Sequence, residues 1–95
     1  MARPPRLTDD QIQVEVEGID GWTFAGGKLQ KTFKFPDFIA AWGFMSKVAL
    51  IAQAMDHHPD WSNVYNTVRV DLSTHDAGGV TQLDLQLARK MNLQV

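Results

Sequence analysis

The sequence predicts an α+β fold in which three helices pack on one face of a four-stranded antiparallel sheet, in the order α-β-β-α-β-β-α. Three observations support this prediction. Residues 37–56 carry apolar side chains at helical spacing. Four short stretches rich in aromatic and β-branched residues form two pairs, and each pair is separated by turn residues. Two further stretches, one near each end of the chain, begin at a threonine that can cap a helix.

The first helix is expected to begin after Thr8. That threonine precedes Asp9 and Asp10, and acidic residues in a first turn interact favourably with the positive end of the helix dipole. The helix should end between Gly18 and Gly21, because glycine adopts the backbone angles that a helix end and a turn require.

Two strands are predicted at 22–24 and 29–35, where aromatic and apolar residues recur at nearly alternate positions. The residues between them, 25–28, include Gly26 and Gly27 and are typical of a hairpin turn. The two strands should therefore pair antiparallel.

The longest helix is predicted to open at Pro36 and Asp37 and to run to about Asp56. Its apolar residues follow a spacing of three or four and cover a wide surface: Phe38, Ile39, Trp42, Met45, Val48, Ala49, Ile51, Ala52 and Met55. Most of this surface is expected to cover the sheet. The excess width could also hold a helix from another subunit.

A second pair of strands is predicted at 61–65 and 68–72, with Asn66 in the turn between them because asparagine tolerates positive φ. Residues 77–79 form a glycine-containing loop. Thr81 can then cap a final helix, whose apolar residues are Leu83, Leu85, Leu87, Ala88 and Met91.

Composition indicates a single domain over residues 1–95 and excludes several functional classes. A net charge of −2 offers little attraction to phosphate backbones, so direct nucleic-acid binding is not expected. No apolar run approaches the roughly 18 residues that cross a bilayer, and the basic N-terminus lacks a following apolar segment, so we expect a cytoplasmic protein without a membrane span. The absence of cysteine excludes disulfides and makes self-association more favourable for so small a fold.

The chain has three histidines, His57, His58 and His75, and all lie at the predicted ends of elements. Imidazole has an unperturbed pKa near 6.5, so it can exchange protons near neutrality. Two interpretations of His57 and His58 are open. They could form part of a catalytic site, or they could be a solvated helix end at which a cation favours the dipole.

Other chemistries fit less well. Asp56, Asp60 and Asp76 lie near the histidines, but adjacent histidines do not share a helix face and no cysteine completes a zinc site, so no metal is expected. The pairs 26–27 and 78–79 are too short for a nucleotide-binding glycine loop. Nothing marks any serine as a nucleophile.

Taken together, several segments resemble the pterin-4a-carbinolamine dehydratase family. The resemblance lies in residues 56–66, 68–72, 73–76 and 81–84, and it extends to 21–22, 33–38 and 43–50. The spacings between the paired histidines, Tyr65, His75 and Asp84 match those of the family. The resemblance covers almost the whole chain from about Leu7. One departure is Gln53, because the family usually has an ionisable residue there, often glutamate.

The resemblance implies a reaction without a cofactor. A 4a-hydroxytetrahydropterin, released by an aromatic amino acid hydroxylase, loses water to give the quinonoid dihydropterin during tetrahydrobiopterin recycling. His57 and His75 would form the acid/base pair and His58 would orient the substrate. Asp56 and Asp84 would assist through hydrogen bonds, although Asp84 could equally be a favourable charge in a first helical turn.

The resemblance also implies a pocket and an assembly. Trp61 would supply part of the pocket wall, although core or interface packing accounts for Trp61 and Trp22 equally well. The Gln53 amide can hydrogen-bond the substrate or a histidine, but it cannot exchange a proton. The family forms homodimers or homotetramers through helices. Animal members also act as dimerisation cofactors of a homeodomain transcription factor, so a protein-binding function with weak catalysis is the alternative.

Overall fold

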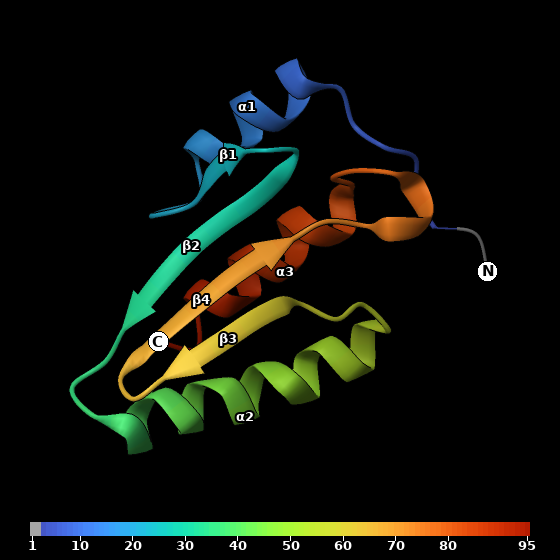
Figure 1. The fold of residues 1–95 in the computed structure, drawn as a ribbon. Coiled ribbons are helices and arrows are strands. Elements are labelled where there is room, and N and C mark those ends of the chain that lie inside the picture. Colours follow the sequence, from blue (N-terminus) through green and yellow to red (C-terminus); the bar gives the residue numbers. More distant parts are fainter. Residues whose placement is uncertain (1–2) are drawn as a thin grey trace.

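The computed structural model describes residues 3–95, so the first two residues of the basic N-terminus lie outside it. Its helices are α1 (Asp9–Glu17), α2 (Phe38–Met55) and α3 (Gln82–Asn92), with a short 3-10 helix η1 (His75–Ala77) before α3. Its strands are β1 (Thr23–Ala25), β2 (Lys28–Lys34), β3 (Asp60–Val64) and β4 (Thr67–Leu72) (Figure 1). The strands form one antiparallel sheet in the order β1-β2-β4-β3, which confirms the predicted fold class.

Local capping interactions define the helix starts. Thr8 and Gln11 form a reciprocal capping box at α1, which ends at Gly18. The Asp37 side chain accepts the Ala40 N–H (2.8 Å) at the start of α2. Thr81 caps α3, as predicted. Helix α2 ends at Asp56, which adopts a left-handed backbone conformation with φ of 51° and turns the chain away from the helix axis.

The two hairpin turns differ in how closely they match expectation. Gly26 and Gly27 both have positive φ, as a tight turn between β1 and β2 requires. Between β3 and β4 the turn is at Tyr65 and Asn66, but the positive φ (50°) belongs to Tyr65. Asn66 instead pairs with Phe35 through its backbone carbonyl (2.9 Å) and its side-chain amide (3.0 Å). The position of the turn was predicted correctly, whereas the role of Asn66 was not.

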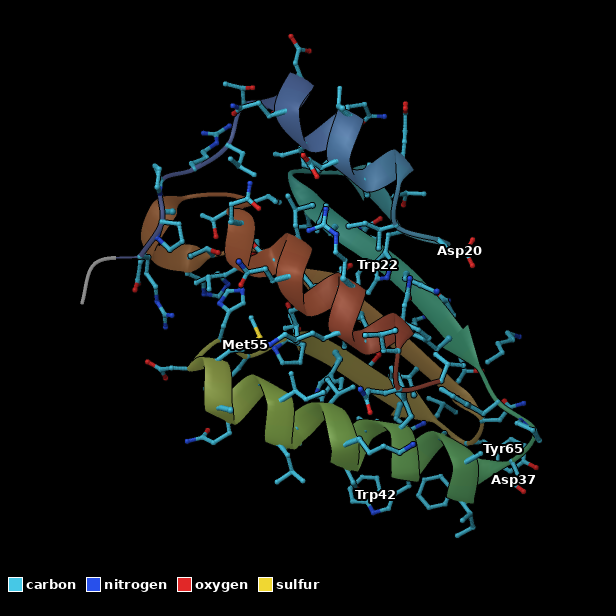
Figure 2. The ribbon with its side chains drawn as sticks, turned by 180° about the vertical axis from the view of Figure 1, so that it is seen from behind. Asp20, Trp22, Asp37, Trp42, Met55 and Tyr65 are labelled. Carbon is cyan, nitrogen blue, oxygen red and sulfur yellow. The ribbon has the colours of Figure 1, made fainter. Side chains whose placement is uncertain are left out.

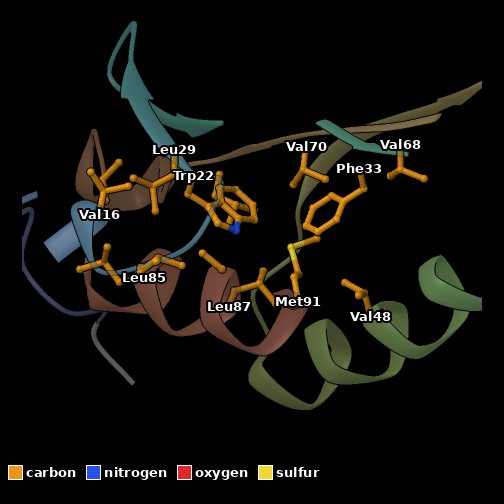
Figure 3. Close-up of a cluster of buried hydrophobic side chains, with 14 of the residues drawn as sticks. Val16, Trp22, Leu29, Phe33, Val48, Val68, Val70, Leu85, Leu87 and Met91 are labelled. Carbon is orange, nitrogen blue, oxygen red and sulfur yellow. The ribbon is translucent and has the colours of Figure 1, made fainter. Parts of the chain in front are cut away.

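The core lies between the sheet and the helices. Alternate side chains of β2 and β4 point to the helical layer, where they meet buried residues of α3 and α2 (Figure 3). The labelled members of this cluster are Val16, Trp22, Leu29, Phe33, Val48, Val68, Val70, Leu85, Leu87 and Met91. The opposite face of the sheet carries polar residues such as Gln30, Thr32, Arg69 and Asp71. Burial on one face of the sheet therefore drives the two-layer arrangement.

Helix α2 is more apolar than its packing in this chain requires. Only Ala41, Phe44, Val48 and Ala52 are fully buried, and Trp42 lies on the side away from the sheet (Figure 2). By length and composition α2 could cross a membrane, since its 18 residues have a mean hydropathy of 1.4 and 22% of them are buried. The expectation that no segment approaches that length is thus wrong for α2. An apolar core helix of a soluble protein meets the same criterion.

The end of α3 is fixed to the first hairpin by a polar cluster. The Asn92 side-chain oxygen accepts hydrogen bonds from the Trp22 indole (3.0 Å) and the Lys31 ammonium (2.9 Å), while its amide donates to the Asp20 carbonyl (3.0 Å). Partial burial lowers the pKa of Lys31, and the nearby charge of Asp20 opposes that shift. This cluster fixes how α3 lies across the sheet, and therefore where its N-terminal end meets the histidines.

Candidate active site

A cavity of about 430 Å³ lies where the end of α2, the edge of the sheet and η1 meet. Its lining residues are Arg3, Asp56, His57, His58, Pro59, Asp60, Asp71, Ser73, Thr74, His75 and Asp76. The volume falls within the range of small-molecule sites, roughly 300–1,000 Å³. All three histidines of the chain line this one cavity.

The register of two strands brings the histidines together. Strand β3 begins just after His57 and His58, and β4 ends just before His75. The two strands are antiparallel, and Asp60 at the start of β3 pairs with Asp71 near the end of β4. The left-handed turn at Asp56 then directs the histidine pair toward the same corner. Segments far apart in sequence therefore meet through ordinary hairpin geometry.

His57 is buried and hydrogen-bonded to Asp84. Its side chain is 6% exposed, and its Nε2 lies 2.6 Å from Oδ1 of the fully buried Asp84. The other carboxylate oxygen, Oδ2, accepts the Thr74 hydroxyl (2.8 Å) and the Thr81 N–H (2.9 Å). Asp84 thus completes the capping box of α3 and also anchors the histidine. A buried carboxylate needs such partners, because removing it from water without them is costly.

His58 and His75 are more accessible. Both are exposed, and both line the cavity. His58 Nε2 lies 2.9 Å from the side-chain oxygen of Gln53 in the last turn of α2. A side-chain amide, rather than a carboxylate, therefore contacts this histidine.

The remaining predicted site residues are divided between the cavity and its surroundings. Asp56 lines the cavity, whereas Gln53 and Asp84 contact histidines from outside the lining. Trp61 does not line the cavity, because it alternates with the outward-facing Asp60 and packs against the core cluster. Trp22 is buried within that cluster.

Sequence reasoning missed several of the lining residues. Ser73 and Thr74 could have been found, since they are polar residues between the end of a strand and a histidine. No sequence pattern pointed to Arg3 as a residue of the site. It is the only Lys or Arg among the residues from 3 to 95 that line the cavity, and its guanidinium donates to the Asp56 carbonyl and lies 3.5 Å from the Asp56 carboxylate. The cavity also contains Asp60, Asp71 and Asp76, so its lining is rich in hydrogen-bond acceptors.

Metal binding has little geometric support here. Within residues 3–95, no three His, Asp or Glu side chains converge in an arrangement that could hold a metal ion. The histidines are instead arranged around open space, with carboxylate and amide partners that can orient imidazole rings.

Comparison with known proteins matches the sequence of this chain to one family. Residues 5–94 match the family model described as pterin 4 alpha carbinolamine dehydratase. The chain belongs to the pterin-4a-carbinolamine dehydratase family. Family membership supports a lyase that acts on a pterin substrate.

Individual relatives agree. A protein from Bradyrhizobium diazoefficiens, provisionally named a pterin-4-alpha-carbinolamine dehydratase, is 56% identical over 89 residues that cover 92% of this chain and 89% of the relative. A relative from Solibacter usitatus with the same provisional name is 51% identical over 87 residues, which cover 92% of this chain and 92% of the relative. A crystal structure from Brucella melitensis, described as a transcriptional coactivator/pterin dehydratase, has a TM-score of 0.90 and 46% identity, with coverage of 94% of this chain and 97% of that one.

The buried position of Asp84 leads to a stability prediction. Asp84→Ala should lower the free energy of unfolding by about 3 kcal/mol, because it leaves His57, Thr74 and the Thr81 N–H without their shared acceptor. Urea denaturation followed by circular dichroism measures this loss. Asp76→Ala, at an exposed position of η1, is the matched control and should change little. Equal losses in the two variants would contradict the role of the buried network.

Proposed function

We propose that this chain dehydrates a 4a-hydroxytetrahydropterin to the quinonoid dihydropterin and water by histidine acid/base catalysis. The single observation that carries the proposal is one cavity lined by His57, His58 and His75. In the reaction, N5 of the pterin loses its proton, its electron pair forms the bond to C4a, and the C4a hydroxyl leaves as water after accepting a proton. Two correctly placed imidazoles are sufficient for these proton transfers.

His57 and His75 form the proposed acid/base pair. His57 is held by Asp84, whose carboxylate lies 2.6 Å from Nε2 and orients the ring. His75 comes from a different segment, so the two rings can reach different atoms of one substrate. His58, fixed by Gln53, orients the substrate between them.

The acidic lining suits the rest of the substrate. A pterin ring carries an amino group and ring N–H groups along one edge, and these groups need hydrogen-bond acceptors. The carboxylates of Asp56, Asp60, Asp71 and Asp76 supply such acceptors around the cavity. We propose that the substrate is produced by an aromatic amino acid hydroxylase in the cytoplasm and that the product returns to the tetrahydrobiopterin pool.

Replacing either member of the proposed pair should slow the reaction. His75→Ala removes an exposed side chain, and His57→Gln keeps an amide that can donate to Asp84 but cannot titrate. Each variant should lose roughly a hundredfold in catalysed rate, the usual contribution of a general acid or base. Stopped-flow measurement with a synthetic 4a-hydroxytetrahydropterin tests this, after subtraction of the uncatalysed reaction. Full turnover in both variants would overturn the assignment.

The Gln53 contact predicts a change in pH dependence. Gln53→Glu places a negative charge beside His58, so His58 should keep its proton to higher pH. The limb of the rate profile that depends on His58 should then move to higher pH by about half a unit. The profile of kcat/KM against pH measures the shift. Gln86→Glu adds the same charge at an exposed position of α3 and should leave the profile in place. A Gln53→Glu profile identical to the parent profile would show that His58 does not titrate in the reaction.

A second candidate function is protein binding through α2. The Brucella melitensis relative is described as both a coactivator and a dehydratase. In this chain Phe38, Ile39, Trp42 and Leu50 of α2 are exposed, between 43% and 76%. We propose that this apolar surface joins copies of the chain into a homodimer or homotetramer and that it can also accept a helix of another protein. Absent turnover with all three histidines intact would favour this function over catalysis.

Charge on the apolar surface should disrupt assembly. Trp42→Glu removes the largest exposed apolar side chain of α2, so the mass measured by light scattering should fall toward that of a single chain. Gln86→Glu adds a charge outside this surface and serves as the control. A Trp42→Glu protein that keeps the parent mass would exclude this surface as the interface.

A further inference from the structure

A chain of buried hydrogen bonds lies behind His57. Thr74, Thr81 and Asp84 are each 2% exposed or less, and they connect the loop after β4 with the start of α3. Within residues 3–95, no buried side-chain nitrogen or oxygen lacks a hydrogen-bond partner. Each buried side-chain group of Thr74, Thr81 and Asp84 therefore has a hydrogen-bond partner.

The directions of these bonds follow from the hydrogens available. The Thr81 N–H can only donate, so Oδ2 of Asp84 is an acceptor. Thr74 donates its single hydroxyl hydrogen to the same oxygen (2.8 Å). The Thr81 hydroxyl, 2.8 Å from the Thr74 oxygen, must then donate to Thr74. The hydrogen bonds thus run from Thr81 through Thr74 to Asp84.

This order assigns the nitrogen atoms of His57. An ionised carboxylate has no hydrogen to donate, so with Asp84 ionised its Oδ1 also accepts, and the hydrogen in the 2.6 Å contact belongs to His57 Nε2. The other nitrogen, Nδ1, has no hydrogen-bond partner in the described part of the chain, and no buried atom there is unpartnered. Nδ1 is therefore reached from the cavity that His57 lines.

We propose that Thr74 is a positioning residue for the dehydration, acting through Asp84. Its hydroxyl donates a hydrogen bond that stabilises the negative charge of Asp84 and orients the carboxylate toward His57 Nε2. Through this contact, Thr74 sets the pH range in which Nδ1 exchanges a proton with the pterin. This role rests on the proposed function. The backbone supports this role, since Thr74 is fixed by its bridge to Gly79 and directly precedes His75. One residue thereby connects the supports of both histidines.

The test compares two substitutions at one site. Thr74→Val keeps the shape and removes the hydroxyl, whereas Thr74→Ser keeps the hydroxyl. Without that donor, Asp84 attracts the proton of His57 more strongly. The titration midpoint of His57, followed by NMR of imidazole-labelled protein, should rise by about one pH unit in Thr74→Val and stay near the parent value in Thr74→Ser.

The kinetic readout should follow the same pattern. In Thr74→Val, the acid limb of the profile of kcat/KM against pH should move to higher pH together with the NMR midpoint. At a pH on that limb, kcat/KM should fall by up to tenfold, mainly through a lower kcat. The other ionisable groups around the cavity are unchanged in both variants: Arg3, Asp56, His58, Asp60, Asp71, His75 and Asp76. A shift in Thr74→Val that Thr74→Ser lacks therefore reports the hydroxyl.

The outcomes separate the two proposals. If the parent protein has no dehydratase activity, the proposed function fails, and the NMR titration still tests the hydrogen-bond chain. If the parent is active and Thr74→Val shifts neither the titration nor the profile, Thr74 is only structural and the inference is wrong. Should Thr74→Val fail to fold, Thr74→Cys replaces it, because a thiol of similar size is a weak donor and predicts a shift in the same direction.

Discussion

The buried contact between His57 and Asp84 is the interaction on which the rest of the site depends. It joins the end of α2 to the first turn of α3 across 27 residues of sequence, and both side chains are almost fully removed from solvent. Such a pair is stable only when the remaining hydrogen-bonding groups are also satisfied. Thr74 and Thr81 meet that condition. The same carboxylate caps a helix and holds a cavity-lining imidazole, so disturbing either role disturbs the other.

The elements of the fold could be predicted because their signals are local. Thr8, Asp37 and Thr81 act within three residues of the helices they start, and paired glycines act within one turn. The turn at Tyr65 and Asn66 shows the limit of this reasoning. Asn66 is used for a contact with Phe35, 31 residues away, and Tyr65 takes the strained backbone angle instead.

The meeting of the three histidines around one cavity could be predicted, whereas most of their surroundings could not. Local chemistry alone left His57 and His58 between a solvated helix end and a proton-transfer site, and the resemblance to a family favoured the latter. The burial of Asp84 depends on contacts with His57 and Thr74 that no local pattern contains. Arg3 reaches Asp56 across 53 residues, and this approach depends on how the N-terminal segment crosses the loop at Val80.

Helix α2 connects the two candidate functions. Its C-terminal end delivers the histidine pair to the cavity and places Gln53 against His58, while Ile39, Trp42 and Leu50 along its length remain exposed. Ile39, Trp42 and Leu50 do not line the cavity, so a partner that covers them need not contact the lining residues. Association and proton transfer are therefore compatible in one small domain. In the proposed function, the apolar face of α2 would mediate association and the corner at Asp56 would carry the proton transfer.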